Sequence, residues 1–389
     1  MLPRFAPNYG LLELLRSAFG RSAPSQACER VKEIVSIEVG KPKVFLTPSC
    51  RGALYLLLKA LPPGRVLLPA YTCSAVVESA VLAGREVVTV DEPDGGINLG
   101  AKALAETLAP GDIIVATHQY GYPCEIKPIT ALAAARGAIV IEDIAGAFTA
   151  RIEGKPAGSF GLACVGSFDT SKLIHSPLKG GFVATGDRAL AERIGQVAAE
   201  RLQPMPLAHR ASVLLSGFAM VIATSFWFYR LFYFTNFQAL GRYSQEDGVL
   251  ARTPGPYYRY AFAEWQAQIV LTQLNQLDAI LSVRQSMLEL YRAELQSCAA
   301  FAVETTQVER PGSVIRFPIF VNGDKIDFHR RLASAGIDTG FSFTKLATPP
   351  TQRYAWRVAE SVLNLPFFSK MTLAQARRVV AAVRSQARS

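Results

Sequence analysis

The chain has 389 residues, half of them apolar, and carries a formal net charge of +10. This length exceeds one simple hydrophobic core, so we expect two domains. The basic residues are spread along the chain without a helix-turn-helix or zinc pattern, which argues against nucleic acid as a partner. A phosphate-bearing substrate or an anionic membrane surface explains the charge better.

The cysteines are scattered and form no CxxC pair. Their spacing is not that of metal ligands, so the sequence predicts no metal site. No signal peptide is recognisable at the start, and free thiols are typical of a reducing cytoplasm, which is the expected location. The six cysteines are Cys28, Cys50, Cys73, Cys124, Cys164 and Cys298.

Residues 1–35 join an aromatic and proline-rich start to a pattern of apolar residues at helical intervals. The apolar positions are Leu11, Leu12, Leu14, Leu15 and Phe19. The pattern predicts an amphipathic helix docked on the protein. A helix lying on a membrane surface is the alternative.

Short apolar runs typical of buried strands alternate with helical stretches through the first half of the chain. The clearest runs cover residues 66–68, 113–116, 138–141 and 162–165. Alternation of this kind predicts a mostly parallel sheet covered by helices on both faces.

Charged side chains follow two of these runs. Asp143 comes after the run 138–141, and Lys172 follows the run 162–165. Ligands of open α/β sheets bind at the carboxyl ends of the strands. A carboxylate that keeps a pyridinium nitrogen protonated and an amine that forms a Schiff base are what pyridoxal phosphate (PLP) requires. Taken singly, the acid is more often a turn or cap residue and the lysine a solvated one.

The amino-acid sequence around both residues is similar to that of a known family. The segments IEDIAGAFTARIEGKPAGSFG (141–161), GSFDTSKL (166–173) and GG (180–181) resemble the DegT/StrS sugar aminotransferases and their pattern IEDxA…GxxxGSFG…SFxxxK…GG. The resemblance implies that Asp143 contacts the pyridine nitrogen, Lys172 is the Schiff-base lysine and Ser167 binds the cofactor phosphate. Weaker similarity extends over most of the chain.

The phosphate-binding turn of the family differs here. The family reads SGTAAL where this chain has SCRGAL (49–54), a strand-to-helix turn whose backbone N–H groups attract an anion. Cys50 and Arg51 therefore replace the family's Gly and Thr. The guanidinium of Arg51 suits a phosphate, although an exposed residue in the first helical turn is the alternative.

Other cofactor positions differ as well. Cys73 replaces an aromatic residue that lies over the pyridine ring in relatives, so Tyr71, His118 or Tyr120 is expected to supply the ring contact. A purely structural role is the alternative for His118. Gly146 stands where the family usually has Gln or His near the phenolic oxygen.

Arg259 stands where the family's Asn reaches the phosphate of the other subunit, which implies a homodimer with shared sites. A basic residue at the start of a helix is the alternative reading of Arg259.

An apolar insert, about 205–240, departs most from the family. The stretch 211–229 carries no charge, and about 19 such residues approach the length of a membrane span. Three interpretations remain open. It forms a buried hairpin or dimer contact, it anchors the chain at a membrane interface through residues 211–237, or it crosses the membrane.

The expected fold is α/β, of the aspartate aminotransferase type. Residues 1–278 are predicted to form the large PLP-binding domain, with the first 35 or so packing on the small domain formed by residues 279–389. The motifs GIDTG (336–340) and LNLPFFSKMT (363–372) resemble the family's small domain, with Phe367 and Phe368 in place of its usual His.

The resemblance implies transfer of an amino group from an amino acid, glutamate, to a keto-sugar, which in the family is usually nucleotide-linked. Loss of polar residues at Cys73, Gly146 and Phe368, together with the insert, suggests a lipid-linked acceptor as a variant, with the enzyme at the inner face of a membrane. The alternatives are another PLP reaction, dehydration or acyl condensation at a membrane surface, and a non-catalytic binding or regulatory protein.

Overall fold

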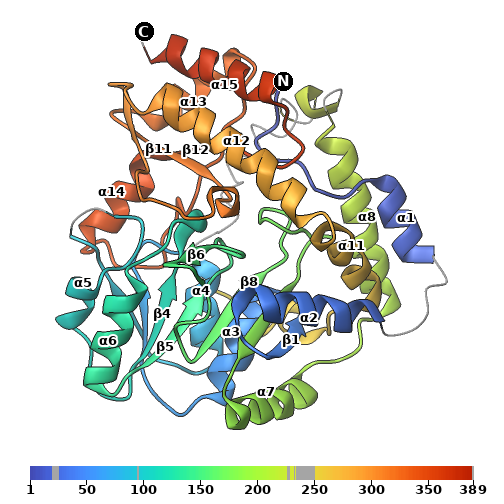
Figure 1. Ribbon diagram of the computed structural model, residues 1–389, viewed down its shortest axis with the longest axis vertical. Helices are drawn as coiled ribbons and strands as arrows, with labels where there is room; N and C mark the ends of the chain where they lie inside the picture. Colours follow the sequence, from blue (N-terminus) through green and yellow to red (C-terminus); the bar gives the residue numbers. More distant parts are fainter. Residues whose placement is uncertain (20–25, 94–95, 226–227, 232, 234–249, 388–389) are drawn as a thin grey trace.

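The computed structural model describes residues 1–19, 26–93, 96–225, 228–231, 233 and 250–387. Its centre is a seven-stranded sheet with the order β1-β9-β8-β5-β4-β2-β3 (Figure 1). Strands β8, β5, β4, β2 and β3 run parallel, and β9 pairs antiparallel with both β1 and β8. The predicted, mostly parallel α/β sheet is therefore confirmed. The strands are β1 Lys43–Thr47, β2 Val66–Pro69, β3 Val87–Val90, β4 Ile113–Thr117, β5 Ile139–Asp143, β8 Ala163–Ser167 and β9 Gly181–Thr185.

Helices cover both faces of this sheet, which explains its unbroken apolar strands. Alternate residues of a strand point to opposite faces. Ile113 and Val115 pack with residues of α3, α4 and α7, whereas Ile114 and Ala116 pack with residues of α5 and α6. The covering helices are α3 Cys50–Ala60, α4 Ser74–Leu82, α5 Ala101–Ala105, α6 Ile126–Arg136 and α7 Arg188–Arg201.

A second unit follows, drawn above the large sheet in Figure 1. It holds an antiparallel sheet of the order β10-β11-β12. The long helix α12 begins at Leu277, close to the predicted domain boundary, which stays a prediction. The elements are α12 Leu277–Leu295, β10 Phe301–Val303, β11 Phe317–Val321, α13 Lys325–Ser334, α14 Arg353–Ser361, β12 Val362–Leu365 and α15 Leu373–Gln386.

The N-terminal residues contact several parts of the chain. Leu2 forms a β-bridge with Ile337, and Arg4 forms an ion pair with Asp338 at 3.6 Å, so the first residues lie against the C-terminal unit. The two helices that follow contact other elements: α1 packs on α8 and α11, and α2 packs on α11 and β1. These helices are α1 Leu11–Phe19, α2 Gln26–Val39, α8 Leu207–Ala223 and α11 Glu264–Leu274.

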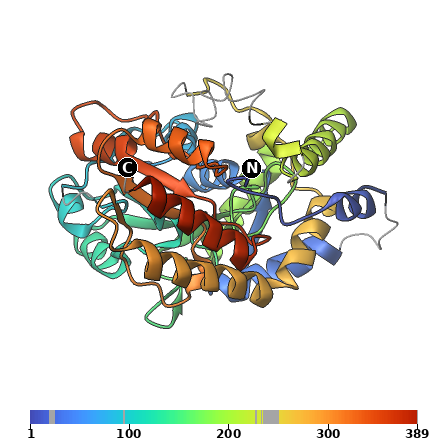
Figure 2. The same ribbon diagram turned by 90° about the horizontal axis from the view of Figure 1, so that it is seen from above.

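The apolar insert begins with α8. Only Val213 and Gly217 of this helix are buried, and Leu215 is 68% exposed, so α8 is not a buried core helix. Both ribbon views place α8 and α1 at one edge of the molecule (Figure 2). No helix among the described residues is long and apolar enough to span a membrane. Residues 226–227, 232 and 234–249 of the insert lie outside the described part.

The remaining short elements connect the larger ones. They are β6 Arg151–Ile152, β7 Lys155–Pro156, α10 Pro256–Arg259 and the 3₁₀ turns Gln119–Gly121 and Pro311–Ser313.

Candidate active site

The two residues singled out from the sequence meet in one cavity. Strands β5 and β8 are parallel neighbours with Asp143 opposite Val165, so Asp143 ends β5 beside the loop that leaves β8 with Lys172. The cavity has a volume of about 130 Å³. The predicted residues that line it are Cys50, Arg51, Cys73, Asp143, Gly146, Ser167 and Lys172.

The carboxyl group of Asp143 is buried in the cavity wall, with 5% of the residue exposed. Its Oδ1 accepts a hydrogen bond from the backbone N–H of Ala145 at 2.9 Å. Burial raises the pKa of Asp143, because the charged form is desolvated, and the nearby Lys172 opposes that rise. A cationic group bound in the cavity would stabilise the carboxylate.

The loop that carries Lys172 is held by several hydrogen bonds. The N–H of Lys172 donates to the backbone oxygen of Asp169 at 2.9 Å. The carboxylate of Asp169 accepts from the N–H of Ser171 at 2.9 Å and forms an ion pair with Lys179. Although burial opposes ionisation of Asp169, the charge of Lys179 lowers its pKa well below the ordinary value.

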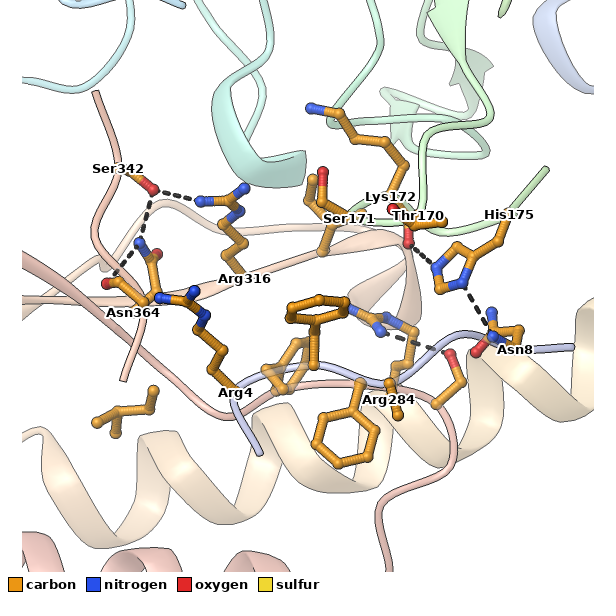
Figure 3. A pocket seen from close by; sticks show the side chains of 18 of the residues that line it. Arg4, Asn8, Thr170, Ser171, Lys172, His175, Arg284, Arg316, Ser342 and Asn364 are labelled. Carbon is orange, nitrogen blue, oxygen red and sulfur yellow. Dashed lines mark hydrogen bonds between the residues drawn. The ribbon is translucent and has the colours of Figure 1, made fainter. Parts of the chain in front are cut away.

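His175 braces the same loop from the other side (Figure 3). Its Nδ1 accepts the backbone N–H of Asn8 at 2.9 Å, so the ring proton is on Nε2, which donates to the backbone oxygen of Lys172 at 2.7 Å. Burial lowers the pKa of His175 to about 4, which keeps the ring neutral. The N-terminal segment therefore helps to fix the lysine-bearing loop.

The start of α3 forms another wall of the cavity. Ser49 caps the helix by accepting the N–H of Gly52 at 3.0 Å. The first N–H groups of a helix have no acceptor within the helix, and Cys50 and Arg51 hold these positions. A Cβ on Gly181 would lie 2.4 Å from the N of Cys50, so glycine allows β9 to approach the helix start. This geometry suits a phosphate.

Arg51 is half-buried, with 26% of its side chain exposed, and forms an ion pair with Glu78 at 3.5 Å. Its guanidinium carbon lies 6.0 Å from the ring centroid of Tyr257. Arg51 thus belongs to the cavity wall and lies beside the helix start, as the phosphate-binding interpretation requires.

Two hydroxyl groups in the wall have no hydrogen-bond partner among the described residues. They are Oγ1 of Thr72 and Oγ1 of Thr117, and both are buried. Each unsatisfied buried hydroxyl costs about 1–3 kcal/mol, so a polar ligand would stabilise the site. A helix N-terminus for a phosphate, a carboxylate for a ring nitrogen, a lysine amine and unsatisfied hydroxyls together fit PLP.

Four predicted residues lie outside this cavity. His118 is fully buried; its Nδ1 accepts the N–H of Cys124, so Nε2 donates to Glu142 at 3.2 Å. Tyr71 and Tyr120 share a hydroxyl hydrogen bond of 2.6 Å behind the wall. Arg259 ends α10, exposed to solvent. None of the four lines the cavity, and their roles toward a cofactor or a partner subunit stay predictions.

Sequence reasoning missed several wall residues. Thr117 is the last residue of β4 and Gln119 lies two residues further on, on either side of His118, which the sequence had indicated instead. Asp169 and Lys179 flank Lys172 in the same loop, so their closeness to Lys172 in the sequence could have indicated that they line the cavity. Arg316 and Phe343 come from the C-terminal unit and carried no local signal.

The fold is α/β, and its cavity holds a buried carboxylate and a lysine at the strand ends of a mostly parallel sheet. The chain belongs to the DegT/DnrJ/EryC1/StrS aminotransferase family, whose model matches residues 26–384.

Individual relatives agree with this membership. The chain is 24% identical over 331 residues to the GDP-perosamine synthase of Escherichia coli O157:H7, covering 82% of this chain and 79% of that protein. Among solved structures, the sugar aminotransferase CalS13 of Micromonospora echinospora has a TM-score of 0.73 at 22% identity, covering 99% and 100% of the two chains. NtdA of Bacillus subtilis, solved with bound cofactor PMP, has a TM-score of 0.74 at 19% identity, covering 99% and 84%.

Proposed function

We propose that this aminotransferase uses PLP to move an amino group from glutamate to a nucleotide-linked keto-sugar. The observation that carries the proposal is the meeting of Asp143 and Lys172 in one buried cavity beside the N-terminus of α3. The relative named GDP-perosamine synthase supports a nucleotide-linked sugar, and the PMP found in NtdA supports the cofactor.

Different residues of the chain would bind the cofactor and move the proton. The start of α3, Arg51 and Ser167 would hold the phosphate, and Asp143 would keep the proton on the ring nitrogen. Bound PLP supplies an electron sink for the carbanion left when the donor loses its Cα proton. The amine of Lys172 would take that proton from Cα and return it to C4′ of the cofactor, acting as general base and then as general acid.

The proposal includes a homodimer in which Arg259 reaches the phosphate bound by the other subunit. Two observations support it. Arg259 is exposed, so its side chain is available to a partner. Its short helix α10 also adjoins the phosphate-binding turn, because Ser49 Oγ donates to the backbone oxygen of Tyr257 at 2.7 Å.

A peripheral membrane contact is a second proposal, and it rests on one surface. We define the α1–α8 surface as the exposed residues Leu11, Leu12, Leu15, Leu207, Leu215 and Ile222. Helix α8 has no acidic residue, and the chain as a whole is basic. Exposed leucines beside a basic background suit an anionic lipid surface. A lipid-linked acceptor would then be accessible to the enzyme.

The visible spectrum of the PLP-loaded protein tests the main proposal. Glutamate is expected to convert the absorption band of the lysine-bound cofactor to that of PMP, with one equivalent of 2-oxoglutarate released. Lys172→Ala should lack the lysine-bound band and the conversion. A band that ignores glutamate would point to another donor or to another PLP reaction, and failure to bind PLP would favour a binding protein.

A further inference from the structure

A second cavity of about 120 Å³ lies on the side of Lys172 that faces the C-terminal unit. Ser171, Lys172, Arg316 and Phe343 line both cavities, so the two spaces share a wall. Arginines reach the second cavity from the N-terminal segment, from α12 and from the residue before β11 (Figure 3). No aspartate or glutamate lines it. The charged residues that line it are therefore all basic.

Arg284 is the most deeply buried of these arginines, with 2% exposed. Its Nε and Nη2 both donate to the backbone oxygen of Val314, at 2.9 and 2.8 Å. The remaining nitrogen, Nη1, has only a long contact of 3.4 Å with Ser369 Oγ. The guanidinium carbon lies 4.6 Å from the ring centroid of Phe367. One edge of the guanidinium thus remains poorly bonded.

Arg284 forms no ion pair with a carboxylate among the described residues. Burial alone lowers its pKa to about 9, so the side chain stays charged at neutral pH. A buried charge without a counter-charge is destabilising, because the protein does not replace the lost hydration. An anion in the cavity would supply the missing counter-charge.

Arg316 also has no carboxylate as a counter-charge among the described residues. It donates to the hydroxyl of Ser342, and its guanidinium carbon lies 5.6 Å from the ring centroid of Tyr120, but it forms no ion pair with a carboxylate in the described part of the chain. Asn364 holds Ser342 in place through a hydrogen bond of 2.7 Å. By contrast, Arg4 is already paired with Asp338. The unmatched charge of the cavity therefore comes from Arg284 and Arg316 beside Lys172.

We propose that Arg284 and Arg316 form an anion-binding subsite that anchors a substrate beside Lys172. The anion is a carboxylate of the amino donor or a phosphate of the acceptor, since a guanidinium binds both groups through paired N–H donors. The inference deepens the proposed function and rests on it for the identity of the substrates. The phenyl rings of Phe5, Phe367 and Phe368 also line the cavity, and apolar surroundings strengthen the interactions of a bound anion.

Isothermal titration calorimetry on the PLP-loaded protein tests the subsite with two probes that do not transaminate. Succinate serves as the carboxylate probe and UDP as the phosphate probe. Arg316→Gln and Arg284→Gln are each expected to weaken binding of at least one probe by about tenfold or more, as loss of a charged hydrogen bond implies. Arg316→Lys should recover part of the affinity. Arg188→Gln, on the exposed side of α7, is the matched control and should bind as the wild type does.

The pattern across the probes identifies the source of the anion. Weaker succinate binding with unchanged UDP binding assigns the subsite to the donor's carboxylate, and the reverse assigns it to the acceptor's phosphate. If neither probe binds the wild type, or both bind Arg316→Gln unchanged, the subsite is overturned. Arg316 is half-exposed, so its variant decides the matter even if Arg284→Gln does not fold. Failure of glutamate to convert the cofactor would overturn the proposed function alone, because neither probe depends on turnover.

Discussion

The backbone N–H of Asn8 donates to Nδ1 of His175, and Nε2 of the same ring donates to the backbone oxygen of Lys172. The N-terminal segment is thereby linked to the lysine-bearing loop through one neutral imidazole. Protonation at Nδ1 would remove the acceptor for Asn8 and place a charge in a buried site.

The first prediction concerns the pH dependence of stability. The pKa of His175 is about 4 in the folded protein and about 6.5 when unfolded, so the unfolded chain binds the extra proton first as the pH falls. The stabilisation is complete above pH 6.5 and is lost toward pH 4, by up to about 3 kcal/mol. Melting temperatures of wild type and His175→Asn should therefore converge as the pH falls through this window. His329, whose pKa is also lowered to about 4, contributes equally to both proteins. Parallel curves would contradict the prediction.

The second prediction concerns Asp143. Asp143→Asn should still bind PLP, because the phosphate and lysine contacts remain, but it can no longer keep the ring nitrogen protonated. We expect kcat for the glutamate half reaction to fall by about 100-fold or more, as with loss of another positioned electrostatic group. Stopped-flow absorption measures the rate. Asp143→Glu keeps the charge and should retain more activity than Asp143→Asn; equal rates for wild type and Asp143→Asn would exclude the assigned role.

The third prediction concerns the close approach of β9 to α3. A methyl group on Gly181 would lie 2.4 Å from the N of Cys50 and 2.5 Å from the carbonyl carbon of Ser49, so Gly181→Ala must push the phosphate-binding turn away. We expect a loss of about 1–3 kcal/mol in stability and weaker PLP binding. Gly186→Ala is the control, because its nearest neighbour would be Pro42 at 3.9 Å. Thermal melting measures the stability and PLP titration the affinity of both variants. Equal values for Gly181→Ala and Gly186→Ala would contradict the prediction.

The fourth prediction tests whether Arg259 acts across a dimer. Arg259→Ala and Lys172→Ala should each have little activity alone. In a mixed dimer, one site would combine an intact Lys172 with an intact Arg259 from the partner. Refolding the two variants together should then restore about a quarter of wild-type activity, the share expected for random pairing of two subunits. A mixture as inactive as its components would place Arg259 outside the neighbouring site.

The fifth prediction concerns the α1–α8 surface. Vesicles containing phosphatidylglycerol should carry the wild type upward in a flotation gradient, and Leu12→Gln combined with Leu215→Gln should reduce that fraction several-fold, since two exposed apolar anchors are lost. Ile37→Gln is the control, because Ile37 is 73% exposed on α2, away from this surface. Equal flotation of both variants, or no flotation of the wild type, would contradict membrane binding by the α1–α8 surface.

The sequence predicted residues that do meet in the first cavity, because that part of the cavity consists of strand ends. Asp143 and Ser167 are the last residues of two buried strands, Lys172 follows the second of them, and the carboxyl ends of parallel strands lie at one edge of a sheet. The alternation of side chains at the end of β4 was harder to predict. Thr117 and Gln119 face the cavity, whereas His118 between them turns back to Glu142.

The other side of the site could not be predicted in the same way. Arg284 lies on α12 and Arg316 precedes β11, and each is an ordinary basic residue in its own segment. Only packing of the C-terminal unit on the sheet brings them to Lys172. Helix α8 was anticipated as apolar, but its degree of exposure depends on the helices around it.

The wall shared by the two cavities constrains any attempt to redesign the enzyme. Arg316 and Phe343 line both spaces, so exchanging either would also change the cavity that holds Asp143. Phe5, Phe367 and Phe368 line only the second cavity. A library confined to these three rings would reshape the second cavity and leave the lining of the first unchanged.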